Sequence, residues 1–309
     1  MIEVRGLVKK YGPERAVDDI SFEVHQGEVL GFLGPNGAGK STTMKVITCY
    51  LPPTEGTVVV DGIDVREDSL SVRQRIGYLP ESTPLYRDMT TYGYLEFIAA
   101  MRGVEASVIP SRIAEMSEVC GLGEVLTKRI EALSKGFRQR VGLAQAMIHD
   151  PAILILDEPT SGLDPNQIVA IRELIKAVGK EKTIVLSTHI LSEVQASCDR
   201  VLISNRGKLV ADGTPQDLQE SFGGGQRISL GVIADADAVA ATLAGWGRAR
   251  VVGRIADGTR ETIFTVLTDE KEDLRPVLFN LAVEHGWQLT ELHRDQANLE
   301  DVFRQLTAN

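Results

Sequence analysis

In the first two thirds of the chain, hydrophobic residues alternate with polar ones in some segments and run together in others. Alternation over residues 2–9 and 20–24 predicts antiparallel strands. Ala152–Leu156 holds five apolar residues in a row, which is typical of a strand buried inside a parallel sheet. Helical spacing is found between residues 91 and 150 and over 165–179. The remaining expected strands are Val29–Leu33, Gly56–Val60, Thr183–Ser187 and Val201–Ser204. This mixture predicts an α/β fold.

Beyond residue 220 the pattern changes. Residues 221–226 include consecutive glycines and are predicted to be a flexible linker. The elements expected after it are strands at Arg227–Ile233, Arg248–Ile255, Glu261–Leu267 and Trp287–Leu292, helices at Ala236–Ala244, Leu274–Glu284 and Leu299–Leu306, and a turn at Asp257–Gly258. This βαββαβ order with a last helix is ferredoxin-like. We therefore predict a first domain over 1–220 and a small α+β domain over 227–309.

One segment between a predicted strand and a predicted helix carries recognisable chemistry. It fits G-x-x-x-x-G-K-S, and it continues as a phosphate-binding cradle made of Gly34, Pro35, Asn36, Gly37, Ala38, Gly39, Lys40, Ser41 and Thr42. Glycines let consecutive N–H groups turn toward an anion, and the helix N-terminus adds unpaired donors. Lys40 can reach the β- and γ-phosphates, and the Ser41 hydroxyl can ligate Mg²⁺. The loop alone predicts a nucleoside triphosphate and does not say how it is used.

The second half of this site is predicted at the end of the apolar strand that includes Ile153–Leu156. Asp157 follows directly and should reach the carboxyl edge of the sheet, where ligands bind in open α/β sheets. We expect Asp157 to hold Mg²⁺, directly or through a water. Glu158, one residue later, can orient or deprotonate an attacking water. Without the glycine loop upstream, the same residues would equally fit a strand followed by a solvated acidic turn.

Composition indicates which kinds of partner and which cellular compartment to expect. The net charge of −10 argues against a broad surface for a phosphate backbone, so we expect no nucleic acid partner. The cysteines, at 49, 120 and 198, match no metal or redox spacing and fit a reducing cytosol. Residues 1–5 do not read as a secretory signal, and no apolar run approaches the roughly 18 residues that span a bilayer.

Taken in order, these motifs resemble the nucleotide-binding subunit of ATP-binding cassette transporters over about residues 1–220. The resemblance implies a RecA-like parallel sheet with an antiparallel β subdomain and a helical subdomain. It also implies that Tyr11 stacks on adenine, although a strand aromatic packed locally is the alternative. His189, after the predicted strand Thr183–Ser187, matches the residue that senses the γ-phosphate, whereas a lone histidine there is more often structural.

The same resemblance implies that a second copy of the chain completes the site. Leu133–Phe137 matches the family's signature loop, in which Ser134 and Gly136 contact the γ-phosphate bound by the opposite subunit. From the residues alone, Ser134 is simply the N-cap of a helix. Ser161–Asp164 matches the loop that passes between the two subunits, so Asp164 is expected near the nucleotide.

Two motifs depart from the family's usual residues. Glu81 follows Gly77–Pro80 where glutamine is usual; a carboxylate can still reach Mg²⁺ but has no amide donors. Lys135 and Phe137 stand in the signature loop where Gly and Gln are commonest. These changes resemble the type-2 exporter group, including drug-resistance subunits and, around residues 81–86 and 161–167, the gliding-associated branch.

The function implied is an ATPase that uses ATP and Mg²⁺, pairs as a homodimer, and drives separately encoded, multi-span membrane permease subunits. Its place is the cytoplasm, at the inner face of the membrane. One alternative is a soluble ATPase of the same family acting on ribosomes or nucleic acid; its relatives commonly carry two cassettes or a long coiled coil. A small-molecule kinase is the other alternative, and it leaves Ser134, Asp164 and His189 unexplained.

Overall fold

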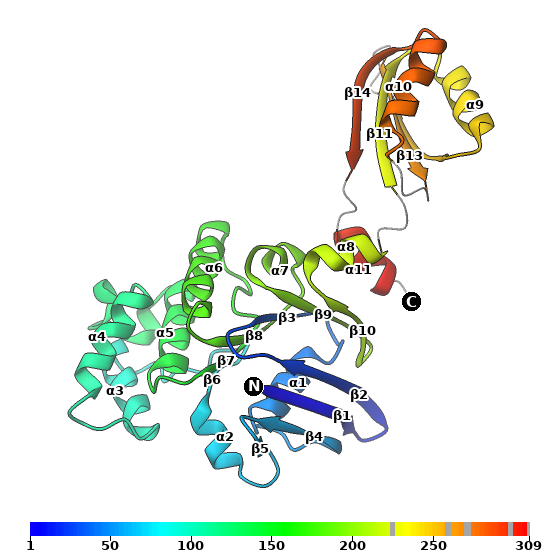
Figure 1. Ribbon diagram of the computed structural model, residues 1–309. Coiled ribbons are helices and arrows are strands. Elements are labelled where there is room, and N and C mark those ends of the chain that lie inside the picture. Colours follow the sequence, from blue (N-terminus) through cyan, green and yellow to red (C-terminus); the bar gives the residue numbers. More distant parts are fainter. Residues whose placement is uncertain (223–225, 257–260, 269–272, 296–298, 308–309) are drawn as a thin grey trace. The chain divides into compact units, whose positions relative to one another are not determined.

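The computed structural model describes residues 1–222, 226–256, 261–268, 273–295 and 299–307 (Figure 1). The chain divides into two compact units, residues 1–215 and residues 216–308. Among the described residues no helix is long and apolar enough to cross a membrane.

The first unit is built around a six-stranded sheet with the order β10-β9-β3-β8-β7-β6. Its strands are β3 (Val29–Leu33), β6 (Ile76–Leu79), β7 (Ile153–Asp157), β8 (Thr183–Thr188), β9 (Arg200–Asn205) and β10 (Lys208–Gly213). All neighbours are parallel except β10, which forms a hairpin with β9. The parallel strands place the loops after β3, β6, β7 and β8 at one edge, as the sequence predicts for a ligand site.

A separate antiparallel sheet has the order β2-β1-β4-β5. Its strands are β1 (Ile2–Tyr11), β2 (Glu14–Val24), β4 (Glu55–Val60) and β5 (Ile63–Asp64). The helices of the first unit are α1 (Lys40–Ile47), α2 (Ser69–Arg75), α3 (Thr91–Met101), α4 (Ile109–Val119), α5 (Lys135–Met147), α6 (Pro165–Gly179) and α7 (Leu191–Ser197), with 3-10 turns at Gly123–Val125 and Ile130–Ala132. α8 (Pro215–Phe222) follows at the boundary of the two units.

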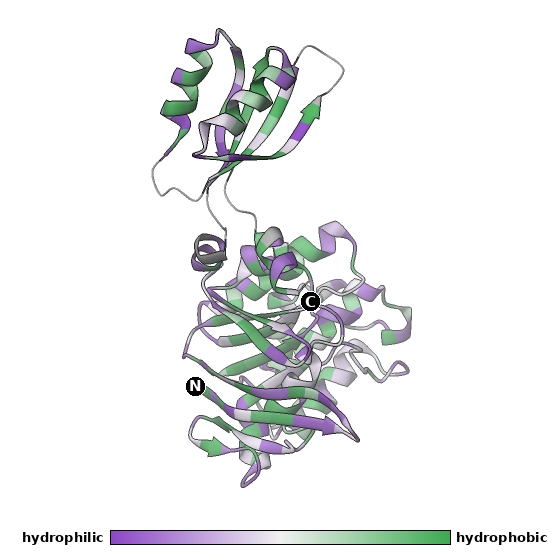
Figure 2. Ribbon diagram, turned by 90° about the vertical axis from the view of Figure 1, so that its right-hand side faces the viewer, coloured by the Kyte–Doolittle hydropathy of each residue, from purple (hydrophilic) through white to green (hydrophobic). Residues whose placement is uncertain are grey.

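Two hydrophobic cores cover the two faces of the six-stranded sheet. Successive side chains of β7 belong to different cores: Leu154 and Leu156 pack with α3, α4, α5 and α6, whereas Ile153 and Ile155 pack with α1 and the antiparallel sheet. A strand buried on both faces must be apolar throughout, which explains the continuous run read from the sequence. Figure 2 shows hydrophobic residues running through the strands of the sheets.

The second unit has a four-stranded antiparallel sheet with the order β12-β13-β11-β14. Its elements are β11 (Gln226–Ile233), α9 (Ala236–Trp246), β12 (Arg250–Ala256), β13 (Glu261–Thr268), α10 (Arg275–Glu284), β14 (Gln288–Asp295) and α11 (Leu299–Thr307). The order of elements is the ferredoxin-like one predicted from the sequence. Its core includes Leu230, Val239, Phe264 and Leu278.

The predicted linker overlaps two elements. Ser221 and Phe222 are the last residues of α8, and Gln226 begins β11. Residues 223–225 and the turn predicted at Asp257–Gly258 lie outside the described residues.

Candidate functional site

The glycine loop joins β3 to α1 and has backbone angles that favour glycine. Gly37 and Gly39 have φ of +81° and +93°. At Gly39 a Cβ atom would also lie 2.4 Å from the Ala16 carbonyl oxygen, so no side chain fits there. Gly39 is the N-cap of α1 and provides no side chain to cap the helix. The first N–H groups of α1 are therefore free to bind an anion.

Lys40 is almost fully buried at the base of this loop. Its ammonium donates to the carbonyl oxygens of Gly34 at 2.8 Å and Pro35 at 3.2 Å. It also lies 3.5 Å from Oε1 of Glu158, which belongs to the segment after β7. These contacts hold the charge at one point, at the edge of the sheet where the loops after β3 and β7 meet.

Ser41 and Asp157 come together as the sequence predicts for an ion site. The Ser41 hydroxyl donates to Oδ1 of Asp157 at 3.0 Å, and the Ser187 hydroxyl donates to the same oxygen at 2.5 Å. Ser41 and Glu81 both line the cavity described below, whereas Asp157 does not. Within the described residues no three His, Cys, Asp or Glu side chains form a metal-binding group. The Ser41 hydroxyl beside the Asp157 carboxylate fits Mg²⁺, which typically takes one or two carboxylates and completes its shell with phosphate oxygens and water.

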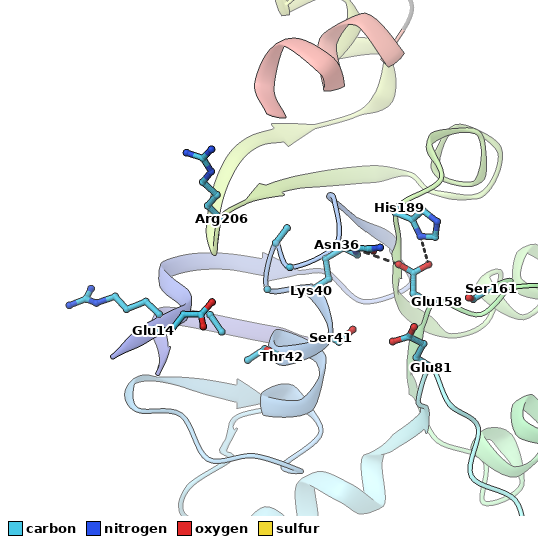
Figure 3. A pocket seen from close by; sticks show the side chains of 15 residues that line it. Glu14, Asn36, Lys40, Ser41, Thr42, Glu81, Glu158, Ser161, His189 and Arg206 are labelled. Atoms are coloured by element: carbon cyan, nitrogen blue, oxygen red, sulfur yellow. Dashed lines mark hydrogen bonds and ion pairs between the residues drawn. The ribbon is translucent and has the colours of Figure 1, made fainter. Parts of the chain in front are cut away.

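Glu158 is held in an unusual backbone conformation beside His189. Its φ of +50° is rare for a residue with a side chain. Its N–H donates to the Ser187 carbonyl and hydroxyl oxygens, each at 3.1 Å. Its Oε2 lies 2.9 Å from Nδ1 of His189, and the carboxylate is 6% exposed. The turn aims Glu158 between the ammonium of Lys40 and the imidazole, as Figure 3 shows.

Lys40, Ser41, Glu158 and His189 line a cavity of about 640 Å³. That volume lies within the range of small-molecule sites. The lining residues are Glu14, Arg15, Ala16, Asn36, Gly37, Ala38, Gly39, Lys40, Ser41, Thr42, Glu81, Glu158, Ser161, His189 and Arg206. The cavity thus combines loop residues, a buried cation, the Ser41 hydroxyl and the carboxylates of Glu81 and Glu158, which is the chemistry a magnesium-bound triphosphate needs.

Arg206 and residues 14–16 were not among the predicted site residues. Arg206 lies in the turn between β9 and β10, and this turn is bonded to the glycine loop because Gly207 N–H donates to the Ala38 carbonyl at 3.3 Å. The Gly207 carbonyl in turn accepts from Asp18 N–H of β2 at 2.8 Å. The pairing of distant strands brings these residues to the cavity, and no spacing in the sequence indicates it.

Tyr11 lies at the end of β1 and is not one of the lining residues. Its side chain is 49% exposed, and the Lys9 ammonium is 5.6 Å from the ring centroid. The ring is therefore neither buried nor packed into a core.

Ser134, Gly136 and Asp164 also lie outside the lining set and form a second group. Ser134 caps α5 by accepting from Phe137 N–H at 3.3 Å, and Asp164 caps α6 by accepting from Gln167 N–H at 3.0 Å. A Cβ atom on Gly136 would lie 2.6 Å from Cδ of Gln167, so the two helix starts touch. The N-termini of α5 and α6 are therefore neighbours, each capped by its own side chain.

Comparison with known proteins identifies the arrangement. The family model described as ABC transporter matches residues 17–161. The probable multidrug ABC transporter ATP-binding protein YbhF of Escherichia coli is 41% identical over 223 residues, or 71% of this chain. The chain spans only 38% of the length of that relative. The linearmycin resistance ATP-binding protein LnrL of Bacillus subtilis is 32% identical over 99% of this chain and 98% of its own length.

A solved structure gives the same result for the fold. The dimeric, post-hydrolysis structure of the ATP-binding cassette MJ0796 with ADP and Pi covers 69% of this chain and 98% of its own. It superposes with a TM-score of 0.64 at 25% sequence identity.

Proposed function

The chain belongs to the ATP-binding subunits of ABC transporters, and on that premise we propose that two copies hydrolyse ATP together to drive a separate membrane permease. The observation that carries the proposal is that Glu158 and His189 meet Lys40 of the phosphate loop at one cavity, which the rest of that loop also lines. A nucleotide-binding module without hydrolysis would not need a buried carboxylate aimed at the triphosphate.

In this proposal the residues of the loop hold the triphosphate. The N–H groups from Gly37 to Thr42 donate to phosphate oxygens, and Lys40 binds the β- and γ-phosphates. Ser41, Asp157 and Glu81 hold Mg²⁺, which when bound neutralises charge on the β- and γ-oxygens. Tyr11 offers an exposed ring face for adenine, in the strand that precedes the lining residues 14–16.

Glu158 positions the attacking water and accepts its proton, because its carboxylate lies beside the site of the γ-phosphate. The hydrogen bond from His189 fixes the orientation of that carboxylate and links it to the phosphate end of the cavity. Proton transfer of this kind contributes typically about 10²–10⁴-fold to a rate.

The group formed by Ser134, Gly136 and Asp164 supports pairing of two copies. These residues present helix N-termini, yet they do not line the cavity of their own chain. We propose that they face the ATP of the opposite copy, so that each cavity is completed in the homodimer. ATP then favours the closed pair, since it binds that arrangement better than the open one.

The proposed docking surface for the permease is the region after Glu81. Tyr86 is 55% exposed although its ring lies 5.7 Å from that of Phe97, which is also exposed. Exposed aromatics of this kind are enriched at protein interfaces. A helix of the permease at this surface would place the chain at the cytoplasmic face of the membrane. LnrL is named for resistance to linearmycin, and because export would remove such a compound from the cell, export is the proposed direction. Membership of the type-2 group or its gliding-associated branch stays a prediction.

Glu158→Gln tests the proposal. We expect the variant to bind ATP, to hydrolyse it at least about 100-fold more slowly, and to elute as a dimer with ATP on gel filtration. Lys40→Ala is the matched control, because it should lose ATP binding and stay monomeric under the same conditions. A monomer for Glu158→Gln at saturating ATP would contradict the two-copy site.

A further inference from the structure

Glu193 is a buried carboxylate that none of the proposed catalytic steps uses. It lies in the first turn of α7 and is 3% exposed. Oε1 accepts from the Thr160 hydroxyl, and Oε2 accepts from the Thr188 hydroxyl at 2.6 Å. No ion pair between described residues includes Glu193. Both of its oxygens are thus committed to threonine hydroxyls.

The two threonines belong to the two segments that bring the proposed catalytic groups together. Thr160 lies two residues after Glu158 and directly before Ser161, which lines the cavity. Thr188 lies directly before His189, and its oxygen also accepts from Ile190 N–H at 3.0 Å. Glu193 therefore connects the segment that carries Glu158 to the segment that carries His189. Glu158 and His189 themselves are in contact at 2.9 Å.

The energetics favour a geometric role over a stabilising one. A buried carboxylate costs free energy of desolvation, and its hydrogen bonds offset that cost only when their geometry is good. Apolar side chains of similar volume in place of Glu193 and both threonines would avoid that cost. What they would not do is fix two separate loops at one point.

We infer that Glu193 is a positioning residue for ATP hydrolysis, which holds the Glu158 and His189 segments at the separation their contact needs. This inference rests on the proposed roles of Glu158 and His189. Glu193 does not line the cavity, so it acts on the hydrolytic step through the two segments and leaves the phosphate loop unchanged.

Glu193→Gln is the first test. The amide accepts from one hydroxyl through its oxygen, but its NH₂ group is a donor, so one threonine loses its acceptor. We expect kcat for ATP to fall about 10-fold, in the range seen when groups that orient a reactive site are removed. KM for ATP and the affinity for ATP in the absence of turnover should stay within about 2-fold.

Glu28→Gln is the matched control. Glu28 is also a shielded carboxylate of the first unit, with 10% of its side chain exposed, and it accepts from Arg200 Nη1 at 3.3 Å and from His25 N–H at 2.7 Å. It does not line the cavity. Both variants should lower the unfolding temperature to a similar extent, and only Glu193→Gln should lower kcat.

Thr160→Val combined with Thr188→Val gives an independent readout. If Glu193 acts through these hydroxyls, the double variant should lose about as much kcat as Glu193→Gln, and the triple variant should lose no more. Equal kcat losses in Glu193→Gln and Glu28→Gln, or a triple variant whose losses multiply, would overturn the inference. Failure of the proposed function is distinguishable, since it would show as normal hydrolysis by Glu158→Gln.

Discussion

Asp157 and Glu158 are adjacent in the chain, but their side chains contact different groups because the backbone changes direction between them. Asp157 ends β7 and points its carboxylate at the hydroxyls of Ser41 and Ser187. Glu158 then adopts φ +50°, which turns its side chain toward Lys40 and His189. Strain of this type is tolerated at functional sites because the surrounding hydrogen bonds over-determine it. The strand therefore places Asp157 at the proposed Mg²⁺ site, and the turn places Glu158 at its proposed catalytic position.

His149 shows that a residue away from the cavity sets a pH limit on stability. Burial, followed by the charge of Arg102, lowers its pKa from 6.5 to about 4. Between these values the unfolded chain binds a proton that the folded chain does not, so folding stability falls as the pH falls. Nε2 lies 3.3 Å from the Ile76 carbonyl oxygen, which fits a neutral ring that donates there.

His149→Gln tests this effect, since its amide keeps a donor for the Ile76 carbonyl. We expect the wild-type free energy of unfolding to fall more steeply than that of the variant between about pH 7 and about pH 5. Urea unfolding at several pH values measures both slopes. Parallel slopes would show that folding does not lower the pKa of His149.

At the scale of elements, β6 and the segment after it lie close against α5 at two glycines. A Cβ atom on Gly77 would lie 2.1 Å from the Ala146 carbonyl oxygen, and one on Gly142 would lie 2.5 Å from Cγ2 of Thr83. The Thr83 hydroxyl also donates to Oε1 of Gln139 at 2.9 Å. The segment that leads to Glu81 is thereby fixed to the helix that Ser134 caps.

Gly77→Ala should force β6 and α5 apart. Because the obstacle is backbone and cannot rotate away, we expect a loss of about 2 kcal/mol or more in the free energy of unfolding. Gly123→Ala is the control, since nothing lies within 4 Å of its added Cβ atom. Equal urea midpoints for the two variants would argue against this close contact.

Long, regular helices and strands could be predicted from the sequence more accurately than short ones. Residues 165–179 were predicted as a helix and form α6 with the same bounds, because a long amphipathic segment gives a clear period. α2 and β5 are too short for any period; Val72 is the one buried residue of α2. The phosphate loop and residues 157–158 could be predicted because each is contiguous in the chain. Arg206 could not, since only the pairing of β9 with β3 brings its turn to the loop.

At the scale of the whole molecule, each unit has its own hydrophobic core and the lining residues of the cavity all belong to residues 1–215. Units with separate cores can unfold separately. A ligand that binds only the native first unit should stabilise that unit alone.

Calorimetry of the whole chain should therefore show two unfolding transitions. ATP with Mg²⁺ at 100 times its dissociation constant should stabilise the first unit by about 2.7 kcal/mol and leave the other transition unmoved. Lys40→Ala should abolish the shift. A single transition would show that the units unfold as one, and two transitions that both shift with ATP would show that binding to the first unit also stabilises the second.

The strand order of the large sheet also governs when the site can form during synthesis. β3 pairs only with β8 and β9 among the described strands, and these are Thr183–Thr188 and Arg200–Asn205. The apolar segment Val29–Leu33 thus leaves the ribosome long before its partners exist. Pairing across such a sequence distance is slow and leaves hydrophobic segments exposed in the meantime. The phosphate loop is therefore made before the strands that position it. A chain that is released before residue 205 has been added should be prone to aggregate.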